Sequence, residues 1–138
     1  MQSQLNPYMG FKRTARKAIE FYESIFGGKV TLTTYKEGQM SKDPSEDDLI
    51  MHAELVAENG IRMMVSDVPK GMDSIQGTNV SLSLSGDNEE ELRGYWDKLS
   101  QGAIIREPLA QAPWGDTFGM LSDQFGIEWM VNISGKHS

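Results

Sequence analysis

The chain has 138 residues, of which 38% are apolar and 24% charged, and its net charge is −7. This length and composition fit a single globular domain over residues 1–138 and exclude an intrinsically disordered chain. The negative charge disfavours nucleic acid as a partner, and no apolar run is long enough for a membrane span, so we expect a cytoplasmic protein. Because the chain has no cysteine, it has no disulfide, thiolate nucleophile or Cys-based metal site.

The first half of the chain is predicted to form a strand, a helix and three further strands. Alternating apolar residues indicate the strand at 6–11, and a helical apolar period indicates the helix at 14–26, which Gly27 and Gly28 end. β-Branched and alternating residues indicate strands at 29–35, 49–57 and 61–66, the last two joined by the turn at 58–60. The polar, acidic segment 36–48 is expected to be a mobile loop.

The second half repeats this order after a linker at 68–78 that is rich in Gly and contains Pro69. A strand is predicted at 79–84, and Asp87 or Asn88 is expected to cap a helix that carries Leu92, Tyr95, Trp96 and Leu99 and is closed by Gly102. Strands are expected at 103–107, 117–121 and 127–133, with a loop through Pro108 and Pro113 after the first of them.

The two halves align at both ends, 6–11 with 79–84 and 60–66 with 126–132. We therefore predict an α+β fold of two tandem βαβββ modules, about 5–67 and about 79–134.

Strand alternation separates a core face from an open face in each module, because residues i and i+2 point to the same side. The core sets are expected to pack under the helices: Pro7, Met9, Phe11; Val80, Leu82, Leu84; Ile61, Met63, Val65; Ile127, Trp129, Val131. The open faces carry polar and thioether side chains and are expected to curve around a ligand, with the helices outside.

Several blocks of sequence together resemble one known family: Asn6-Pro7-Tyr8, Ala18-Ile19-Glu20-Phe21-Tyr22, Phe26-Gly27-Gly28, Met51-His52-Ala53-Glu54-Leu55, Met64-Val65-Ser66-Asp67, Phe118-Gly119-Met120 and the run 123–132. Their order and spacing resemble the PhnB-like branch of the vicinal oxygen chelate (glyoxalase/bleomycin resistance/dioxygenase) superfamily over nearly the whole chain. The resemblance implies the glyoxalase/bleomycin-resistance fold, a curved mixed sheet around a cavity, and a homodimer.

The resemblance implies four positions for metal ligands, because the metalloenzymes of that superfamily carry them on the opening and closing strands of the modules. Here these positions fall on Asn6, Asn79, Met64 and Met130. None is a His or a carboxylate, and thioethers and neutral amides are poor ligands for a hard divalent cation. We expect no metal cofactor; the alternative is a rearranged site that uses His52, Glu54 and Glu128.

The chain has two histidines, His137 near its end and His52 within it, and His52 shares a strand face with Glu54. The two residues are interpreted either as a catalytic acid/base pair or, for His52, as a hydrogen-bonded wall residue. The predicted ligand-binding residues are Tyr8, Met64, Ser66, Asn79, Trp114, Glu128, Met130 and Asn132. Trp114 is either an aromatic lid over a pocket or a dimer or core anchor, whereas Ser66 and Asn132 are either polar anchors or spacers.

Two functions remain open at this point. The first is a small-molecule-binding protein whose pocket is lined by some of the nine methionines. The second is an enzyme of the lyase, isomerase or oxygenase kind that uses His52 with Glu54 or Glu128, with or without metal. A structural dimer that binds no small molecule is a third, plainer possibility.

A homodimer is predicted in every case, because pairing of modules across two chains would cover the open sheet edges. No glycine-rich cofactor turn is present, so we expect no methyl-donor site.

Overall fold

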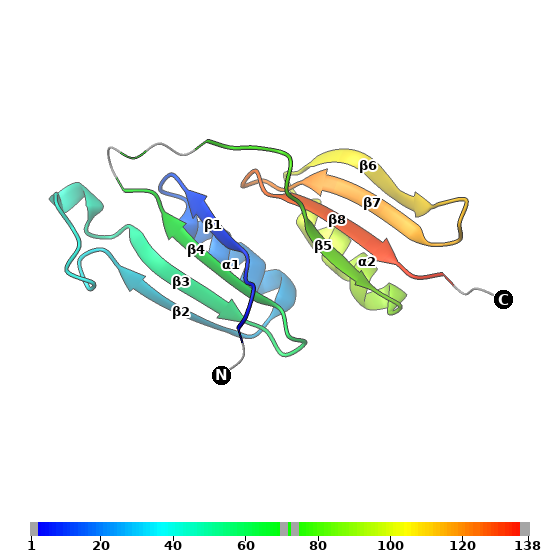
Figure 1. Ribbon diagram of the computed structural model, residues 1–138, viewed down its shortest axis with the longest axis horizontal. Coiled ribbons are helices and arrows are strands. Elements are labelled where there is room, and N and C mark those ends of the chain that lie inside the picture. The colour runs from blue at the N-terminus through cyan, green and yellow to red at the C-terminus, as the bar shows by residue number, and fades with distance from the viewer. Residues whose placement is uncertain (1–2, 70–71, 73–74, 136–138) are drawn as a thin grey trace. The chain divides into compact units, whose positions relative to one another are not determined.

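The computed structural model describes residues 3–69, 72 and 75–135. His137, Met1, Gln2 and parts of the predicted linker, including Gly71, lie outside the described residues. The chain forms two compact units, residues 1–75 and 76–138. Each unit is a βαβββ module (Figure 1), which confirms the predicted α+β fold with two tandem modules.

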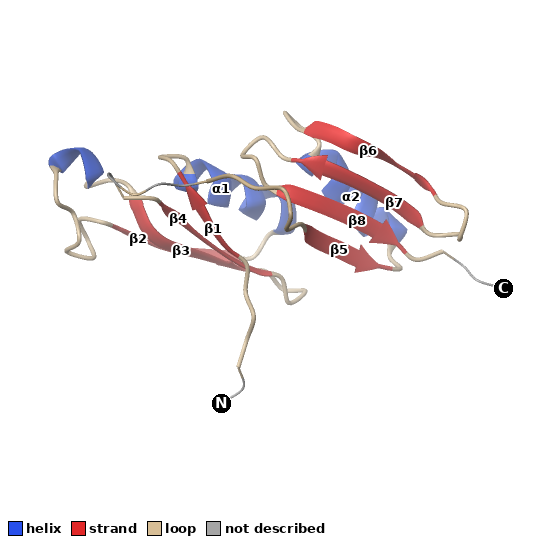
Figure 2. Cartoon of the chain, turned by 45° about the horizontal axis from the view of Figure 1, so that its top comes forward, coloured by secondary structure: helices blue, strands red, loops and turns tan. Residues whose placement is uncertain are grey.

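The first module contains β1 (Tyr8–Phe11), α1 (Ala15–Phe26), β2 (Lys29–Thr34), β3 (Ile50–Val56) and β4 (Arg62–Asp67), with a short 3₁₀ turn at Pro44–Glu46. Its sheet has the order β1-β4-β3-β2, with β1 parallel to β4 and the other pairs antiparallel. Helix α1 lies against one face of this sheet and leaves the other face open (Figure 2).

Helix α1 buries the stripe of residues that the sequence pattern predicts: Ala15, Ala18, Ile19, Tyr22, Ile25 and Phe26. The stripe packs on β3 and β4, whose residues Leu55, Met63 and Val65 are nearly inaccessible to solvent. Burial of each large apolar side chain contributes roughly 1.5–3 kcal/mol, so this interface is the main stabilising contact of the module. Gly27 ends the helix with φ 71, a conformation that glycine adopts without strain.

The second module contains β5 (Leu82–Gly86), α2 (Glu89–Leu99), β6 (Ile104–Gln111), β7 (Thr117–Ser122) and β8 (Glu128–Ile133). Its sheet repeats the topology of the first, with the order β5-β8-β7-β6 and β5 parallel to β8. Asn88 caps α2 by accepting a hydrogen bond from the backbone N–H of Glu91, as predicted. Leu92, Trp96 and Leu99 form its buried face, whereas Tyr95 is only half-buried and donates to Glu91.

The prediction for the opening strand of the second module is wrong by about three residues. The strand β5 begins at Leu82 instead of Asn79, and Val80, predicted as core, is 73% exposed. The register explains the error: Tyr8 pairs with Met64, whereas Ser83 pairs with Met130. Counting back two residues from each makes Ser81 the equivalent of Asn6. A shift of two residues preserves the alternation of faces, so hydrophobic patterning alone could not detect it.

The strand β6 continues to Gln111, although the sequence predicted a loop from Pro108. Because β6 is an edge strand, the missing N–H of Pro108 costs little. Two register irregularities interrupt its pairing with β7, between Ile105 and Glu107 and between Glu107 and Ala110. The first is a bulge in which Arg106 and Glu107 together oppose Met120.

The segment predicted as a mobile loop, 36–48, contains internal hydrogen bonds. The Ser41 hydroxyl donates to the carboxylate of Asp47 at 2.6 Å, and Glu46 is buried within the segment. Its mobility stays a prediction. Neither described helix is long and apolar enough to cross a membrane.

Candidate functional site

The open face of the first sheet gathers the predicted site residues of that module. Tyr8 on β1, His52 and Glu54 on β3, and Met64 and Ser66 on β4 all alternate with buried core residues, so they point away from α1. The register places Met64 between Tyr8 and Glu54. Three strands thus bring one imidazole, one phenol, one carboxylate, one thioether and one hydroxyl onto a single surface, although their segments are far apart in sequence.

The Tyr8 hydroxyl lies 3.1 Å from Nδ1 of His52, and the two rings are tilted by 41° with centroids 5.6 Å apart. Tyr8 is 53% exposed, and His52 is half-buried. The hydroxyl therefore reaches across β4 and fixes the imidazole by a hydrogen bond at Nδ1. His52 makes this contact with Tyr8 and not with its strand neighbour Glu54, and its Nε2 atom takes no part in it.

The positions expected to hold a divalent metal carry unsuitable ligands in this structure. Met64 and Met130 occupy matching places on β4 and β8, and the matching places that precede β1 and β5 hold Asn6 and Ser81. Each module thus offers one thioether together with an amide or a hydroxyl, none of them anionic, so neither pair fits a hard cation. No group of three or more His, Asp or Glu side chains suited to a metal occurs in the described part of the chain.

The open face of the second sheet carries Glu128, Met130 and Asn132 on β8, as predicted from alternation. The side-chain amide of Asn132 donates to Asp116 at 3.1 Å, and the other carboxylate oxygen of Asp116 accepts from the backbone N–H of Gly135. Asn132 therefore orders the end of β8. Asn79 lies before β5 and is exposed, so the structure does not place it on this sheet.

Trp114 lies at the tip of the β6–β7 hairpin and is 62% exposed. The hairpin turn is closed by backbone hydrogen bonds between Ala112 and Asp116 and between Gly115 and Ala112. This exposure contradicts the predicted alternative of a core anchor, whereas an aromatic lid and a dimer anchor stay predictions.

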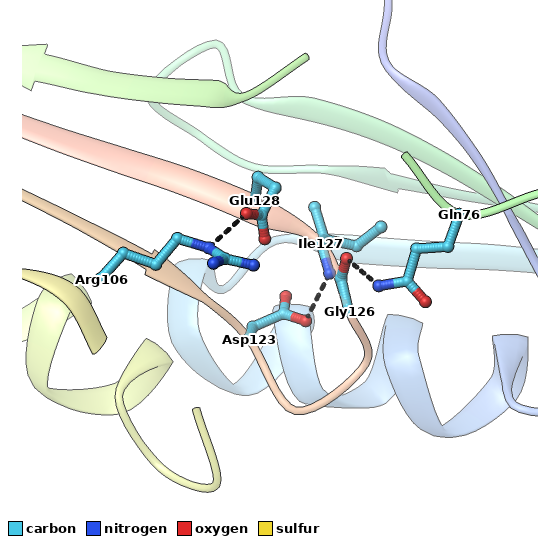
Figure 3. Close-up of polar contacts among 6 residues, drawn as sticks. All are labelled: Gln76, Arg106, Asp123, Gly126, Ile127 and Glu128. Atoms are coloured by element: carbon cyan, nitrogen blue, oxygen red, sulfur yellow. Dashed lines mark hydrogen bonds and ion pairs between the residues drawn. The ribbon is translucent and has the colours of Figure 1, made fainter. Parts of the chain in front are cut away.

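Glu128 forms an ion pair with Arg106, in which Nε of the guanidinium donates to Oε1 at 2.6 Å (Figure 3). Glu128 is 8% exposed, whereas the Arg106 side chain is 44% exposed. Arg106 reaches the carboxylate from the β6 bulge, across the intervening strand β7. The second carboxylate oxygen, Oε2, is buried and has no hydrogen-bond partner among the described residues.

The turn before Glu128 is fixed by Asp123. One carboxylate oxygen of Asp123 accepts from the backbone N–H groups of Phe125 and Ile127, and the other accepts from the Trp129 indole at 2.9 Å. Gln76 donates to the carbonyl of Gly126 at 3.0 Å on the outer side of this turn (Figure 3). These contacts hold the start of β8, and therefore the position of Glu128.

Sequence reasoning missed Arg106 and Asp123. Asp123 carried a usable signal, because an Asp three residues before a Gly of positive φ is typical of a side-chain-capped turn. Arg106 carried none, because its side of the sheet depends on a bulge that leaves no mark in the hydrophobic pattern.

The sequence and the fold match one family. The profile of the Glyoxalase/Bleomycin resistance protein/Dioxygenase superfamily matches residues 4–131. Protein PA1353 from Pseudomonas aeruginosa has a similar crystal structure, with a TM-score of 0.83 at 31% identity, covering 98% of this chain and 100% of that chain. The putative 3-demethylubiquinone-9 3-methyltransferase PhnB from Bacillus cereus gives a TM-score of 0.74 at 26% identity, covering 96% and 100%. Protein YjdN of Escherichia coli is 27% identical over 141 residues, 94% of each chain.

Proposed function

The chain belongs to the Glyoxalase/Bleomycin resistance protein/Dioxygenase superfamily, and from this premise we propose that it is a PhnB-like protein that binds a small organic molecule without a divalent metal centre. The observation that carries the proposal is the replacement of the metal ligands by Asn6, Ser81, Met64 and Met130. A fold whose metal positions are neutral retains the surface for a ligand but lacks the charge for a cation.

The chemistry of the open faces favours an organic ligand. Met64 and Met130 are half-buried, flexible and polarisable, and such side chains adapt to aromatic and irregular apolar shapes. Tyr8, His52 and Ser66 on the first sheet, and Glu128 on the second, place polar groups beside these thioethers. Polarisable side chains beside a few placed polar groups are typical of small-molecule sites.

The metal part of the proposal is tested by elemental analysis of protein purified without chelators. We expect far less than one Zn, Ni, Mn or Fe per chain, and no change in that content for His52→Ala. A stoichiometric metal that His52→Ala removes would contradict the proposal and would favour a rearranged metal site.

The ligand part is tested by titrating 4-fluorophenol into protein with ¹³C-labelled methionine methyl groups. We expect saturable shifts of Met64 and Met130, which lie on the open faces. Met63 is the internal control, because it is adjacent in sequence to Met64 but is 1% exposed on the core face. Unchanged signals, or equal shifts of Met63 and Met64, would refute binding at the open faces.

The hydrogen bond between Tyr8 and His52 supports a second candidate, an enzyme that transfers protons through His52. A phenol that fixes Nδ1 leaves Nε2 as the group able to exchange a proton with a substrate, with Glu54 on the same face. The test is deuterium incorporation from D₂O at the α-carbon of phenylacetone, followed by NMR. Exchange that requires His52 and weakens in Glu54→Gln would support the enzyme; a rate equal to buffer alone would refute it for this probe.

We also propose a homodimer. The edge strands β1, β2, β5 and β6 offer unpaired backbone groups, and Ile104 on β6 is 65% exposed. Light scattering after size exclusion is expected to give about twice the 15.4 kDa chain mass. The mass of a single chain would contradict this proposal.

A further inference from the structure

Glu128 combines deep burial with an unused hydrogen-bond acceptor. The residue is 8% exposed, and its Oε2 atom is buried without a hydrogen-bond partner among the described residues. A buried carboxylate oxygen that has lost water and gained no donor is destabilising, because its desolvation is not compensated. Native proteins rarely leave such a group unsatisfied, and the exceptions often mark the place of a water, ion or ligand.

The contact with Arg106 determines which kind of donor fits. Nε of Arg106 already binds Oε1, so the carboxylate charge is balanced before a ligand arrives. A cationic ligand at Oε2 would therefore lie close to a guanidinium and be repelled by it. An uncharged O–H or N–H group can satisfy Oε2 without this penalty, and a hydrogen bond to a charged acceptor is stronger than one between neutral groups.

The surroundings hold the acceptor in place but leave a way to reach it. Asp123 and Gln76 fix the backbone of the turn that precedes Glu128, and Arg106 holds the carboxylate itself through Oε1 (Figure 3). The Arg106 side chain is long and 44% exposed, and it extends from a bulge in an edge strand. Solvent therefore reaches the guanidinium side of the ion pair while Nε stays bound to Oε1.

We infer that Oε2 of Glu128 accepts a hydrogen bond from an uncharged hydroxyl or amide group of the bound molecule, with Arg106 as the residue that positions the carboxylate. This inference rests on the proposed function and adds the ligand class: an apolar or aromatic body that carries a neutral hydrogen-bond donor. The apolar body would contact Met130, which is two residues further along the same face of β8.

The test compares two probes of similar size, 4-fluorophenol and 1,4-difluorobenzene, of which only the first can donate a hydrogen bond. Binding is followed by ¹⁹F NMR and by the methionine methyl signals. The wild-type chain is expected to bind 4-fluorophenol about tenfold more tightly, as one hydrogen bond to a charged acceptor implies. Glu128→Met keeps the length of the side chain but removes the acceptor. This variant is expected to bind the two probes with about equal affinity.

Glu107→Met is the matched control, because Glu107 is an exposed carboxylate beside Arg106 on the same bulge. It is expected to keep the wild-type preference. If Glu128→Met does not fold, Glu128→Gln replaces it; this variant keeps one oxygen and is expected to retain part of the preference.

Equal affinity of both probes for the wild-type chain, or a preference that survives in Glu128→Met, overturns the inference and leaves the proposed function standing. Binding of neither probe overturns both. The two failures are therefore distinguishable in one experiment.

Discussion

Asp67 provides the sharpest prediction about stability. It ends β4 with 2% exposure, and its two carboxylate oxygens accept from the backbone N–H groups of Ala15 at 3.0 Å and Ile50 at 2.8 Å. It therefore links the start of α1 to the start of β3. Thr14, the residue in the N-cap position of α1, makes no capping hydrogen bond through its own side chain. Asp67, which lies on β4, caps the helix instead.

The magnitude follows from these two bonds. Each hydrogen bond to a charged acceptor contributes about 1.5–3 kcal/mol. Asp67→Ala removes both and leaves two buried N–H groups unsatisfied, so we expect a loss of about 3–5 kcal/mol. Asp67→Asn keeps one acceptor oxygen but turns an NH₂ group towards the other N–H, so a loss of about 2 kcal/mol is expected. Either value is a large share of the roughly 5–15 kcal/mol that stabilises a typical domain.

Urea unfolding followed by circular dichroism measures the loss, and amide hydrogen exchange locates it. The exchange of Ala15 and Ile50 is expected to accelerate more in Asp67→Asn than that of Leu121, which lies in the other module. Asp48→Asn is the control, since Asp48 is an exposed carboxylate of the same module. An Asp67→Ala variant as stable as wild type would refute the assignment of Asp67 as a structural link.

Three further predictions follow from other contacts. A methyl group on Gly119 would lie 2.8 Å from Trp96 and 2.9 Å from the Leu109 backbone, so Gly119→Ala is expected to lower the unfolding free energy in urea by about 1–3 kcal/mol. The control is Gly94→Ala, whose added methyl meets nothing within 4 Å and which is expected to raise the unfolding free energy by roughly 0.5–1 kcal/mol. Equal effects of the two variants would contradict this account. Burial first, then the charges of Asp67 and Glu46, raise the pKa of Tyr35 above its ordinary 10.0. The folded state therefore favours the neutral phenol of Tyr35. The stability that this preference contributes is complete below pH 10 and is lost as the pH rises through the pKa of the folded state. Between about pH 9 and 11, the unfolding free energy of Tyr35→Phe is therefore expected to drop less than that of the wild-type chain. Tyr8→Phe removes the contact with Nδ1 of His52 and is expected to shift the imidazole tautomer ratio by up to about tenfold in ¹⁵N NMR, whereas an unchanged ratio would show that the contact is weak in solution.

The fold followed from local patterns wherever one periodicity applied over a whole element. The buried stripe of α1 and the Asn88 cap of α2 were predictable, because side-chain period and capping chemistry are local properties. The start of β5 was not, because a two-residue slip keeps every side chain on its face and only pairing with β8 fixes the register. The length of β6 was not predictable either, because Pro108 interrupts a central strand but is tolerated at an edge.

The candidate site was predictable face by face but not contact by contact. Alternation placed His52, Glu54 and Met64 on one open face, and the structure has them there. The partner of His52 was not visible in sequence, because Tyr8 reaches it across a strand that is distant along the chain. The spacing of two residues along β3 pointed to Glu54 as the partner of His52. The order of the strands in the sheet instead places the phenol of Tyr8 within hydrogen-bonding distance.

Duplication explains why the two open faces differ while the cores agree. Met64 and Met130 occupy matching positions, but Tyr8 matches Ser83, and Arg62 matches Glu128 by its place two residues after the turn glycine. Core positions are constrained by packing against a helix, so they stay apolar in both modules. The ion pair joins the buried carboxylate of Glu128 to the Arg106 side chain, which is 44% exposed, and desolvation of the carboxylate offsets part of the attraction. The burial of Glu128 and its Oε2 atom, which has no hydrogen-bond partner among the described residues, make this pair the place on the second sheet where we propose to seek a bound hydrogen-bond donor.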